Sequence, residues 1–583
     1  MEFTFGEYFE YKHHAARIPA LTADGSDPQR HRVVIAGGGP TGLALALDIA
    51  RHGVPVTVLE ADDTVCSGSR AGAFTRRTLE ILERLGVIDE VMRTGHGWTT
   101  GWTYYRDKEV FRLEMPHDEN QKYPPIISHL QNYIEHCMVD EAERLGDLID
   151  IRWQTQVKAL RQDAQGARLE VTTPAGDYAL DADWVVACDG GRSTVRELLG
   201  LRLEGRRHEG RYVIIDIRID TDGLPVGRRC WFDPPSKPGG TLLMYKKPSG
   251  MLRFDYQLDD EDDENEEMKP ERVFKQVGEH LKMLGVDRPW EPVWMSLYRA
   301  SALTLDSYLH GRVLFAGDAA HLVPIFGVRG MNSAIDDAHN LGWKLAFVVK
   351  GLASRTLLQT YSDERVYAAR ENHRFASKSA EFMAPPSRPF RLMRDAVLSL
   401  SEKHPWVTRL MNPRQHAAIP LVHSPLNAFA RRSAEFGAGP VPGDILRECP
   451  IEIEGRRGFL TDLLGPHFTA FYFSESGEVP APLAAAFASI ASRMPFQVQR
   501  IVRGAAAGGK APPGMPAAPQ ASIAEAAAID ATGRLFPMYG ARDGSLYLVR
   551  PDGHVMARWL SAEPDELVEA LGRVVAAESE VLS

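Results

Sequence analysis

The sequence predicts an α/β fold divided among several domains, and three observations support this prediction. A buried strand, a glycine-containing turn, a helix and a second buried strand follow one another between residues 31 and 60, which is the pattern of a βαβ unit. Residues 205–300 are rich in short strand-like segments. The chain of 583 residues is about three times the usual size of one domain. Hydrophobic residues make up 44% and charged residues 25% of the chain, which is enough apolar material for several cores.

The composition excludes several classes of protein. The formal net charge of −11 argues against nucleic-acid binding, which needs a basic surface. The first 30 residues lack the unbroken apolar segment of a secretory signal, and no stretch approaches the roughly 18 apolar residues of a membrane span. The five cysteines are scattered, without a C-x-x-C pair, which disfavours disulfides and a zinc site. We therefore expect a soluble, cytoplasmic protein that binds no metal, membrane or nucleic acid.

The βαβ unit carries a glycine motif. Gly37, Gly39 and Gly42 have the G-x-G-x-x-G spacing between the strand RVVIAG and the helix LALALDIARHG. The first glycine permits a tight turn, the second lets the backbone approach a pyrophosphate, and the third allows close packing of helix on strand. Pro40 lies at the start of the helix, and Glu60 ends the next strand, where it can bind the hydroxyls of an adenosine ribose. The motif predicts a bound dinucleotide but does not separate FAD from NAD.

Two further segments decide between these cofactors. Residues 189–196 are DGGRSTVR, and residues 317–324 are GDAAHLVP, which lead into a long helix. With all three motifs in order, the chain resembles the FAD-dependent aromatic hydroxylases (class A flavoprotein monooxygenases), in particular the branch of phenol hydroxylase and 3-(3-hydroxyphenyl)propionate hydroxylase. The resemblance covers roughly residues 31–440. It implies a Rossmann-like FAD-binding domain with an inserted β-sheet substrate domain.

The resemblance also assigns cofactor contacts. It places Asp318 on the flavin ribitol and the backbone of Gly330, Met331 and Asn332 at the pyrimidine end of the flavin. These three residues open a helix, whose N-terminal amides favour the negative charge of reduced flavin by roughly 0.3–2 kcal/mol. Further cofactor contacts are implied for Asp189, Gly317, Arg70 and Gln131.

The implied reaction begins with reduction of FAD by NADPH or NADH. O2 then adds at flavin C4a, and oxygen is transferred to a phenolic ring. A phenol with a pKa of about 10 must lose roughly 3 units to be half ionised at pH 7, and burial alone moves the pKa the wrong way. A proton acceptor or a positive field is therefore needed. Our candidates are Arg253 and Asp255 in RFDYQL and Tyr298 in SLYRA; each is alternatively an exposed strand residue.

A predicted hairpin suggests the substrate class. The predicted hairpin of residues 245–253, YKKPSGMLR, has the same length as the hairpin that binds the substrate carboxylate in 4-hydroxybenzoate hydroxylase. The resemblance places Lys247 at the carboxylate-binding position and Tyr245 beside it. The substrate is then a phenol with a carboxylate. The alternative is that both lysines of the hairpin lie at an exposed tip.

The chain departs from the family pattern near the flavin. Ile325, Val328, Arg329 and Ala334 stand where proline, glycine, glutamine and glycine are usual, and Gly72 stands where phenol hydroxylase has a pocket aspartate. The group that activates the ring is thereby left open.

The C-terminal third resembles the thioredoxin-like domain of the phenol hydroxylase branch, but it lacks C-x-x-C. A role in supporting the fold or in a homodimer contact is expected, and the low-complexity segment 504–521 is expected to be a flexible loop. The predicted segments are 1–30 (extension), 31–204 (FAD-binding), 205–300 (substrate sheet), 301–440 (FAD-binding and helical) and 441–583 (thioredoxin-like).

Other functions remain open at this point. An epoxidase or a halogenase-like oxidoreductase would share the FAD motifs, although the W-x-W-x-I-P segment of the halogenases is absent. A non-catalytic flavin-binding protein would share them too. It would be recognised by the lack of substrate-stimulated nicotinamide oxidation.

Overall fold

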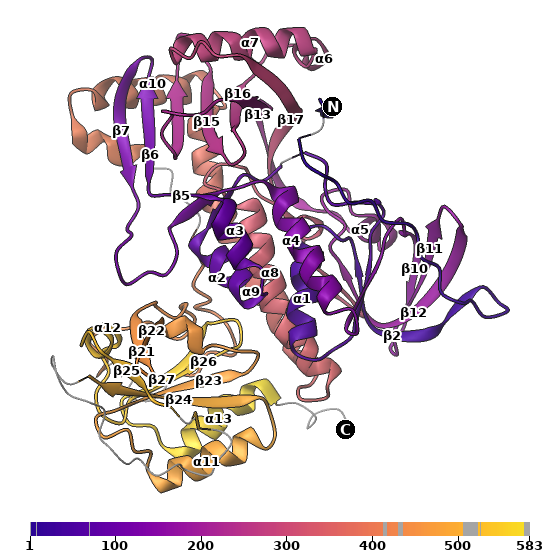
Figure 1. Cartoon of the computed structure of the whole chain (residues 1–583), viewed down its shortest axis with the longest axis vertical. Helices are drawn as coiled ribbons and strands as arrows, with labels where there is room; N and C mark the ends of the chain where they lie inside the picture. Colours follow the sequence, from indigo (N-terminus) through magenta and orange to yellow (C-terminus); the bar gives the residue numbers. More distant parts are fainter. Residues whose placement is uncertain are drawn as a thin grey trace.

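The structure is a computed structural model that describes residues 2–6, 8–68, 70–411, 417–429, 435–504, 523–524 and 526–575. Its strands form three large sheets and one small one (Figure 1). The first sheet contains the predicted βαβ unit and lies beside the central helices. The second contains most of the predicted β-rich segment and lies at the top of the view. The third belongs to the C-terminal part and forms a separate orange and yellow body at the bottom. The predicted α/β class is confirmed.

The first sheet contains the predicted βαβ unit. Its order is β10-β11-β12-β2-β3-β9, with β19 pairing to β12 and β18. The neighbours β12, β2, β3 and β9 are parallel, and helix α1 crosses from β2 to β3 with almost every residue buried, which explains the continuous apolar runs of this segment. The elements are β2 (Ser26–Ala36), α1 (Pro40–Arg51), β3 (Val56–Leu59), β9 (Ile149–Arg152), β10 (Gln156–Gln162), β11 (Ala167–Thr173), β12 (Gly176–Ala187), β18 (Leu309–His310) and β19 (Val313–Phe315).

The second sheet is built mainly from the predicted β-rich segment. Its order is β1-β17-β13-β16-β15-β14-β6-β7, with β20 pairing to β17. One face packs on helix α7, and the other packs on α9 and α10. Four strands come from outside residues 205–300: β1, β6, β7 and β20. The elements are β1 (Glu2–Thr4), β6 (Thr100–Tyr105), β7 (Lys108–Glu114), β13 (Glu204–Ile219), β14 (Arg228–Phe232), β15 (Thr241–Lys247), β16 (Met251–Gln257), α6 (Glu264–Glu267), α7 (Pro270–Met283), β17 (Trp290–Thr304) and β20 (His321–Leu322).

Long helices connect the sheets. The predicted long helix is α8, which is almost entirely buried between α1 and α9. Helix α9 extends from the first sheet to the second, where Ala380 and Met383 join the core. The elements are β4 (Ala73–Thr75), α2 (Arg76–Arg84), α3 (Ile88–Thr94), β5 (His96–Trp98), β8 (Ile126–Ser128), α4 (Gln131–Arg144), α5 (Thr194–Leu198), α8 (Gly330–Val349), α9 (Thr356–Met383) and α10 (Arg388–Ser401).

The third sheet has the arrangement expected of a thioredoxin-like domain. Its order is β22-β21-β25-β24-β23-β26-β27, with β23 and β24 parallel around helix α11 and the predicted hairpin β26–β27 antiparallel. All five cysteines are free. The low-complexity segment falls almost wholly outside the described residues, and the predicted domain boundaries stay a prediction. The elements are β21 (Pro450–Ile453), β22 (Arg456–Phe459), β23 (Phe468–Ser474), α11 (Ala481–Ala491), β24 (Phe496–Arg503), β25 (Ala528–Asp530), α12 (Leu535–Tyr539), β26 (Leu546–Val549), β27 (Val555–Trp559) and α13 (Pro564–Val575).

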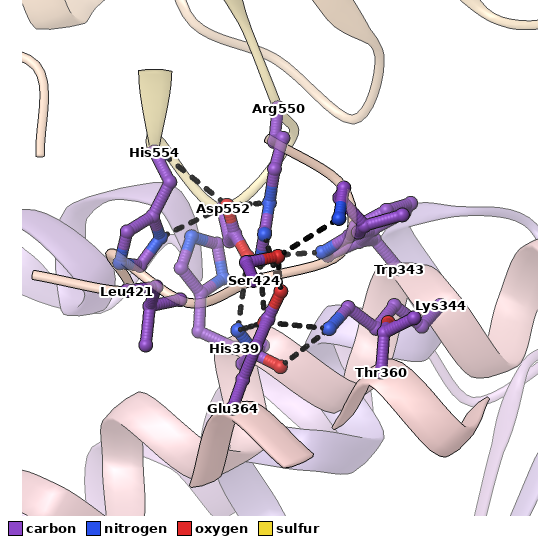
Figure 2. Close-up of polar contacts among 12 residues, drawn as sticks. His339, Trp343, Lys344, Thr360, Glu364, Leu421, Ser424, Arg550, Asp552 and His554 are labelled. Atoms are coloured by element: carbon purple, nitrogen blue, oxygen red, sulfur yellow. Dashed lines mark hydrogen bonds and ion pairs between the residues drawn. The ribbon is translucent and has the colours of Figure 1, made fainter. Parts of the chain in front are cut away.

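A buried group of charged residues joins the third sheet to helices α8 and α9, and we call Lys344, Glu364, Arg550 and Asp552 the interdomain cluster (Figure 2). Arg550 donates to Glu364 at 2.7 and 2.9 Å and also binds Asp552. Lys344 donates to Glu364 at 2.7 Å. Burial alone would raise the pKa of Glu364, but the charges of Arg550 and Lys344 hold it well below its usual range. The C-terminal part is therefore fixed to the helices by paired charges.

Candidate active site

A single cavity of about 1070 Å³ connects the first sheet to the second. At one end it is lined by the glycine turn after β2 and by Glu60. At the other end it is lined by side chains of the second sheet, among them Tyr245, Arg253, Asp255 and Tyr298. The structure thus brings most of the predicted dinucleotide residues and most of the predicted substrate residues to one space.

The three motif glycines have different surroundings. Gly37 has φ +103°, and a Cβ there would lie 2.5 Å from the carbonyl oxygen of Cys188. A Cβ on Gly42 would lie 1.9 Å from the carbonyl oxygen of Gly37, which is the close approach that the motif needs. A Cβ on Gly39 would meet nothing within 4 Å, although Gly39 lines the cavity. The space beside Gly39 therefore fits a pyrophosphate at the start of α1, which begins at Pro40.

Glu60 lies at the end of β3 and reaches back to this turn. Its Oε2 accepts a hydrogen bond from the backbone N–H of Gly38 at 2.5 Å, and its Oε1 accepts one from Asp62 at 2.9 Å. Burial raises the pKa of the Glu60 carboxyl. The position at the carboxyl end of β3 is where a ribose is expected in this fold.

The two other motif segments pack beside the glycine turn and the start of α1: a Cβ on Gly37 would lie 2.9 Å from the Cα of Asp189, and one on Gly317 would lie 2.4 Å from Thr41. The carboxylate of Asp318 is open to the cavity, and among the described residues no hydrogen bond to it is found. The surrounding protein raises its pKa by desolvation, although the side chain is exposed to the cavity. Gly317, before it, has φ +61° and donates its N–H to Asp337 at 3.1 Å. Asp189 also lines the cavity, and its Oδ2 accepts the N–H of Val195 at 3.0 Å. An unpaired carboxylate such as Asp318 suits the hydroxyls of a ribitol chain.

Helix α8 begins at Gly330 and points its first turn into the cavity, with Gly330 and Met331 among the lining residues. The side chain of Asn332 is committed elsewhere: it accepts from the N–H of Thr75 at 2.8 Å and donates to the carbonyl of Ala73 at 3.2 Å. Asn332 therefore fastens β4 to α8, and only its backbone is available to a flavin. Val328, where the family usually has glycine, has φ +53°, a strained conformation for a β-branched residue.

Arg70 and Gln131 both line the cavity. The side chain of Arg70 is 63% exposed and lies 3.5 Å from Glu2, so it can reorient toward a bound molecule. Gln131 is more constrained: its Oε1 accepts the N–H of Ala71 at 2.9 Å and its Nε2 donates to Glu135 at 2.8 Å. The Gln131 amide thus holds the segment that carries Arg70.

A salt bridge that the sequence did not predict lies at the substrate end. Arg253 donates to both oxygens of Asp216, at 2.9 and 2.7 Å, and to the carbonyl of Arg70 at 2.8 Å. Lys247 is fully buried and donates to Asp216 at 3.3 Å. Burial, together with the charge of Arg253, lowers the pKa of Lys247 to about 7. Lys247 is not at an exposed tip, and it lies behind the cavity wall rather than on it.

Asp255 differs from its neighbours because its charge is not compensated by contact. It is 95% buried and lines the cavity, yet among the described residues no partner to its Oδ1 is found. Burial raises its pKa to about 6. Tyr298 also lines the cavity, but its hydroxyl accepts the N–H of Ile325 at 3.0 Å, so it holds the loop before α8. Asp255 is consequently the predicted residue that is best placed to accept a proton.

Comparisons with known proteins identify the chain. The model of the FAD-binding domain family matches residues 30–376, more than half of the chain, so the chain belongs to this family. The 3-(3-hydroxy-phenyl)propionate/3-hydroxycinnamic acid hydroxylase of Mycolicibacterium smegmatis is 27% identical over 454 residues, which cover 76% of this chain and 77% of the relative. The structure of p-nitrophenol 4-monooxygenase PnpA from Pseudomonas putida is 27% identical, with TM-score 0.57, and covers 65% of this chain and 96% of its own.

The fold match includes most of the C-terminal third. The structure of the flavin-dependent monooxygenase PieE with FAD and substrate has TM-score 0.74 at 22% identity and covers 94% of this chain and 99% of its own. The protein is thus an enzyme of the FAD-dependent aromatic hydroxylases, with FAD as its cofactor and NAD(P)H as the reductant typical of the family. These predictions from the sequence are confirmed. In the described part of the chain, no helix is both long and apolar enough to cross a bilayer.

Proposed function

We propose that the protein hydroxylates a phenol that carries a carboxylate on a short side chain, using FAD, NADH or NADPH, and O2. The observation that carries the proposal is the cavity. It joins the glycine turn after β2 to a polar face of the second sheet, where some buried polar atoms have no hydrogen-bond partner among the described residues. The names of relatives at 26–28% identity, hydroxylases of 3-(3-hydroxyphenyl)propionate and 3-hydroxycinnamate, support this substrate class.

The cofactor residues bind and orient. Gly39 leaves room for the pyrophosphate, Glu60 faces the adenosine ribose, and Asp318 faces the ribitol chain. The first amides of α8 meet the pyrimidine end of the flavin, where they stabilise negative charge. Bound FAD supplies the activation of O2.

The substrate residues position the phenol and take its proton. We assign Asp255 as the acceptor of the phenolic proton. Arg253, held in place by Asp216, supplies positive charge beside the ring. Tyr298 accepts a hydrogen bond from the N–H of Ile325 and so holds the loop before α8 against the second sheet. This contact positions the phenolic ring of the substrate relative to the flavin.

Tyr245 is the proposed contact to the substrate carboxylate, and Lys247 is proposed to attract that carboxylate through its charge. Tyr245 reaches the cavity directly. Lys247 acts from behind the wall: with Arg253 it shares one carboxylate, that of Asp216, so this group has a net positive charge whenever Lys247 is protonated.

The proposal is tested by turnover. Purified, FAD-loaded protein is incubated with 3-(3-hydroxyphenyl)propionate, 3-hydroxycinnamate, phenol or 4-nitrophenol, while nicotinamide oxidation, O2 uptake and the hydroxylated product are followed. We expect the two acids to give the highest kcat/KM and a product with one added oxygen. Nicotinamide oxidation that no phenol stimulates, or that yields only peroxide with every phenol, contradicts the proposal.

We also propose a cytoplasmic location and a homodimer. Five free cysteines support a reducing compartment. Exposed apolar side chains on and after α10, such as Leu392, Met393 and Trp406, support a contact between copies. Light scattering coupled to gel filtration measures the mass in solution, and a mass of one chain contradicts the dimer.

A further inference from the structure

Arg228 is a buried arginine next to the lining of the cavity, on the face of the second sheet that carries Tyr245. It is the first residue of β14 and is 5% exposed. In the register of the sheet it lies directly opposite Tyr245, which lies opposite Arg253, which lies opposite Asp216. Cross-strand partners point to the same face. Arg228 therefore extends the row of polar side chains that begins at the cavity wall.

This arginine differs from the other buried arginines in its polar contacts. Within the described ranges, neither a hydrogen bond nor an ion pair to the Arg228 guanidinium is found, and its Nε is buried without an acceptor. Each of the other buried arginines in the same ranges donates to a carboxylate, an amide oxygen or a backbone carbonyl. An uncompensated buried charge costs several kcal/mol. Such a group is expected where a ligand completes the pairing.

We propose that the Arg228 guanidinium and the Tyr245 hydroxyl bind the carboxylate of the phenolic substrate, an inference that rests on the proposed function. The charge of Arg228 acts on two titratable groups, Tyr245 and Cys230. Neither is an anion at neutral pH, so both leave the guanidinium available to an anionic ligand. A guanidinium also binds a carboxylate through two parallel hydrogen bonds. Lys247 and Arg253 are already occupied by Asp216.

The spacing in the sheet matches the length of such a substrate. Asp255 is on β16 and Arg228 is on β14, with β15 between them, so the two strands are about 10 Å apart. Asp255 faces Leu243, which faces Cys230, and Arg228 is two residues before Cys230, on the same face. A ring with its hydroxyl at Asp255 and a three-carbon acid chain spans this separation once both side chains reach inward.

The test compares Arg228→Met and Arg228→Lys with Arg229→Met. Arg229 is the matched control, because its side chain points to the other face and lies 5.8 Å from the ring of Trp102. The probes are 3-(3-hydroxyphenyl)propionate and its uncharged amide, titrated into FAD-loaded protein while the flavin absorption spectrum is followed. We expect Arg228→Met to weaken binding of the acid by at least 30-fold and that of the amide by less than twofold. Arg228→Lys should be intermediate, and Arg229→Met should match the parent.

Thermal stability separates a ligand-binding role from a structural one. Without substrate, Arg228→Met removes an uncompensated buried charge, so the melting temperature of the flavin-loaded protein should stay the same or rise. A lower melting temperature, or equal weakening of acid and amide, overturns the inference. If Arg228→Met does not yield folded protein, the inference fails too, unless Arg228→Lys folds and shows the loss for the acid alone. A parent protein that hydroxylates neutral phenols but prefers no acid refutes the role of Arg228 and leaves hydroxylation itself intact.

Discussion

Two buried regions of this molecule are rich in charge, but they differ in how the charges are compensated. In the interdomain cluster, both oxygens of Glu364 and of Asp552 accept hydrogen bonds, and Arg550 binds both residues. On the face of the second sheet that carries Tyr245, Asp255 and Arg228 are buried without such partners in the part of the chain that the structure describes. Both arrangements cost desolvation energy, but only the first recovers it within the protein. The difference indicates that the cluster maintains the fold and that the cavity face binds a ligand.

The motif glycines also differ in their surroundings, because Gly42 contacts the protein and Gly39 faces open space in the cavity. We expect substitutions at these two glycines to have the largest effect. Gly39→Val should abolish FAD binding and leave the apoprotein folded, because the new side chain enters only the cavity. Gly42→Val should prevent folding, because its Cβ would lie 1.9 Å from the carbonyl oxygen of Gly37. Flavin absorbance and circular dichroism measure the two outcomes. Full FAD occupancy in folded Gly39→Val contradicts the assignment.

Removing one member of the interdomain cluster should be the next largest effect. Arg550→Met leaves Glu364 and Asp552 buried with like charges, so we expect a loss of about 3–5 kcal/mol of stability. A thermal melt monitored by intrinsic fluorescence measures it. Arg542→Met, at an exposed position in the same sheet domain, is the control. If both variants melt together with the parent, the cluster does not maintain the fold.

Asp255→Asn tests the uncompensated acid. Loss of the proton acceptor should lower kcat by about 10²–10⁴-fold, with KM for the acid changed much less. Because the pKa of Asp255 is raised to about 6 by burial, against the opposing charges of Arg253 and Lys247, the parent should lose activity as the pH falls below about 6. The variant should lack this limb of the pH profile.

The groups around Asp255 titrate too, so the pH profile needs a control. Asp216 is held ionised by Arg253 and Lys247, and Lys247 titrates near pH 7. Asp222→Asn, an exposed position, should retain the parental profile. An unchanged acid limb in Asp255→Asn would assign the proton acceptor elsewhere.

Lys247→Met should give the smallest effect. It tests whether Lys247 acts on the substrate through its charge or only maintains the fold. Burial lowers its pKa to about 7, so its charge is present below pH 7 and is lost as the pH rises. We expect KM for the acidic phenol to rise about tenfold in the variant at pH 6.5, a loss of about 1.4 kcal/mol. The effect should be smaller at pH 8.5 and absent for the amide. Equal KM values at both pH values would leave Lys247 with a structural role alone.

The sequence predicted the local features well. The spacing of Gly37, Gly39 and Gly42 determines a turn whose conformation depends only on residues close in the sequence. The helix that begins at Gly330 has an apolar face, which is visible in the spacing of its apolar residues. The hairpin around residues 248–250 was predicted for the same reason. All three are short-range patterns.

The sequence could not predict the pairing of charges. Asp216 lies in the apolar segment VIIDIRI, 37 residues from Arg253, and only the register of β13 against β16 brings them together. The row from Arg228 to Asp216 crosses four strands, whose order in the sheet (β14, β15, β16, β13) differs from their order in the sequence. Which charges are compensated is thus decided by sheet register, which no local pattern specifies.

The interdomain cluster also limits how this enzyme can be divided or recombined. The part of the chain that matches the FAD-binding family ends at residue 376, yet Glu364 within it depends on Arg550. A shortened enzyme that stops before the third sheet would expose Trp343 and leave Lys344 and Glu364 at a new surface. A C-terminal domain exchanged for that of a relative must supply an arginine and an aspartate at these positions. The catalytic part is therefore not a module that can be transplanted alone.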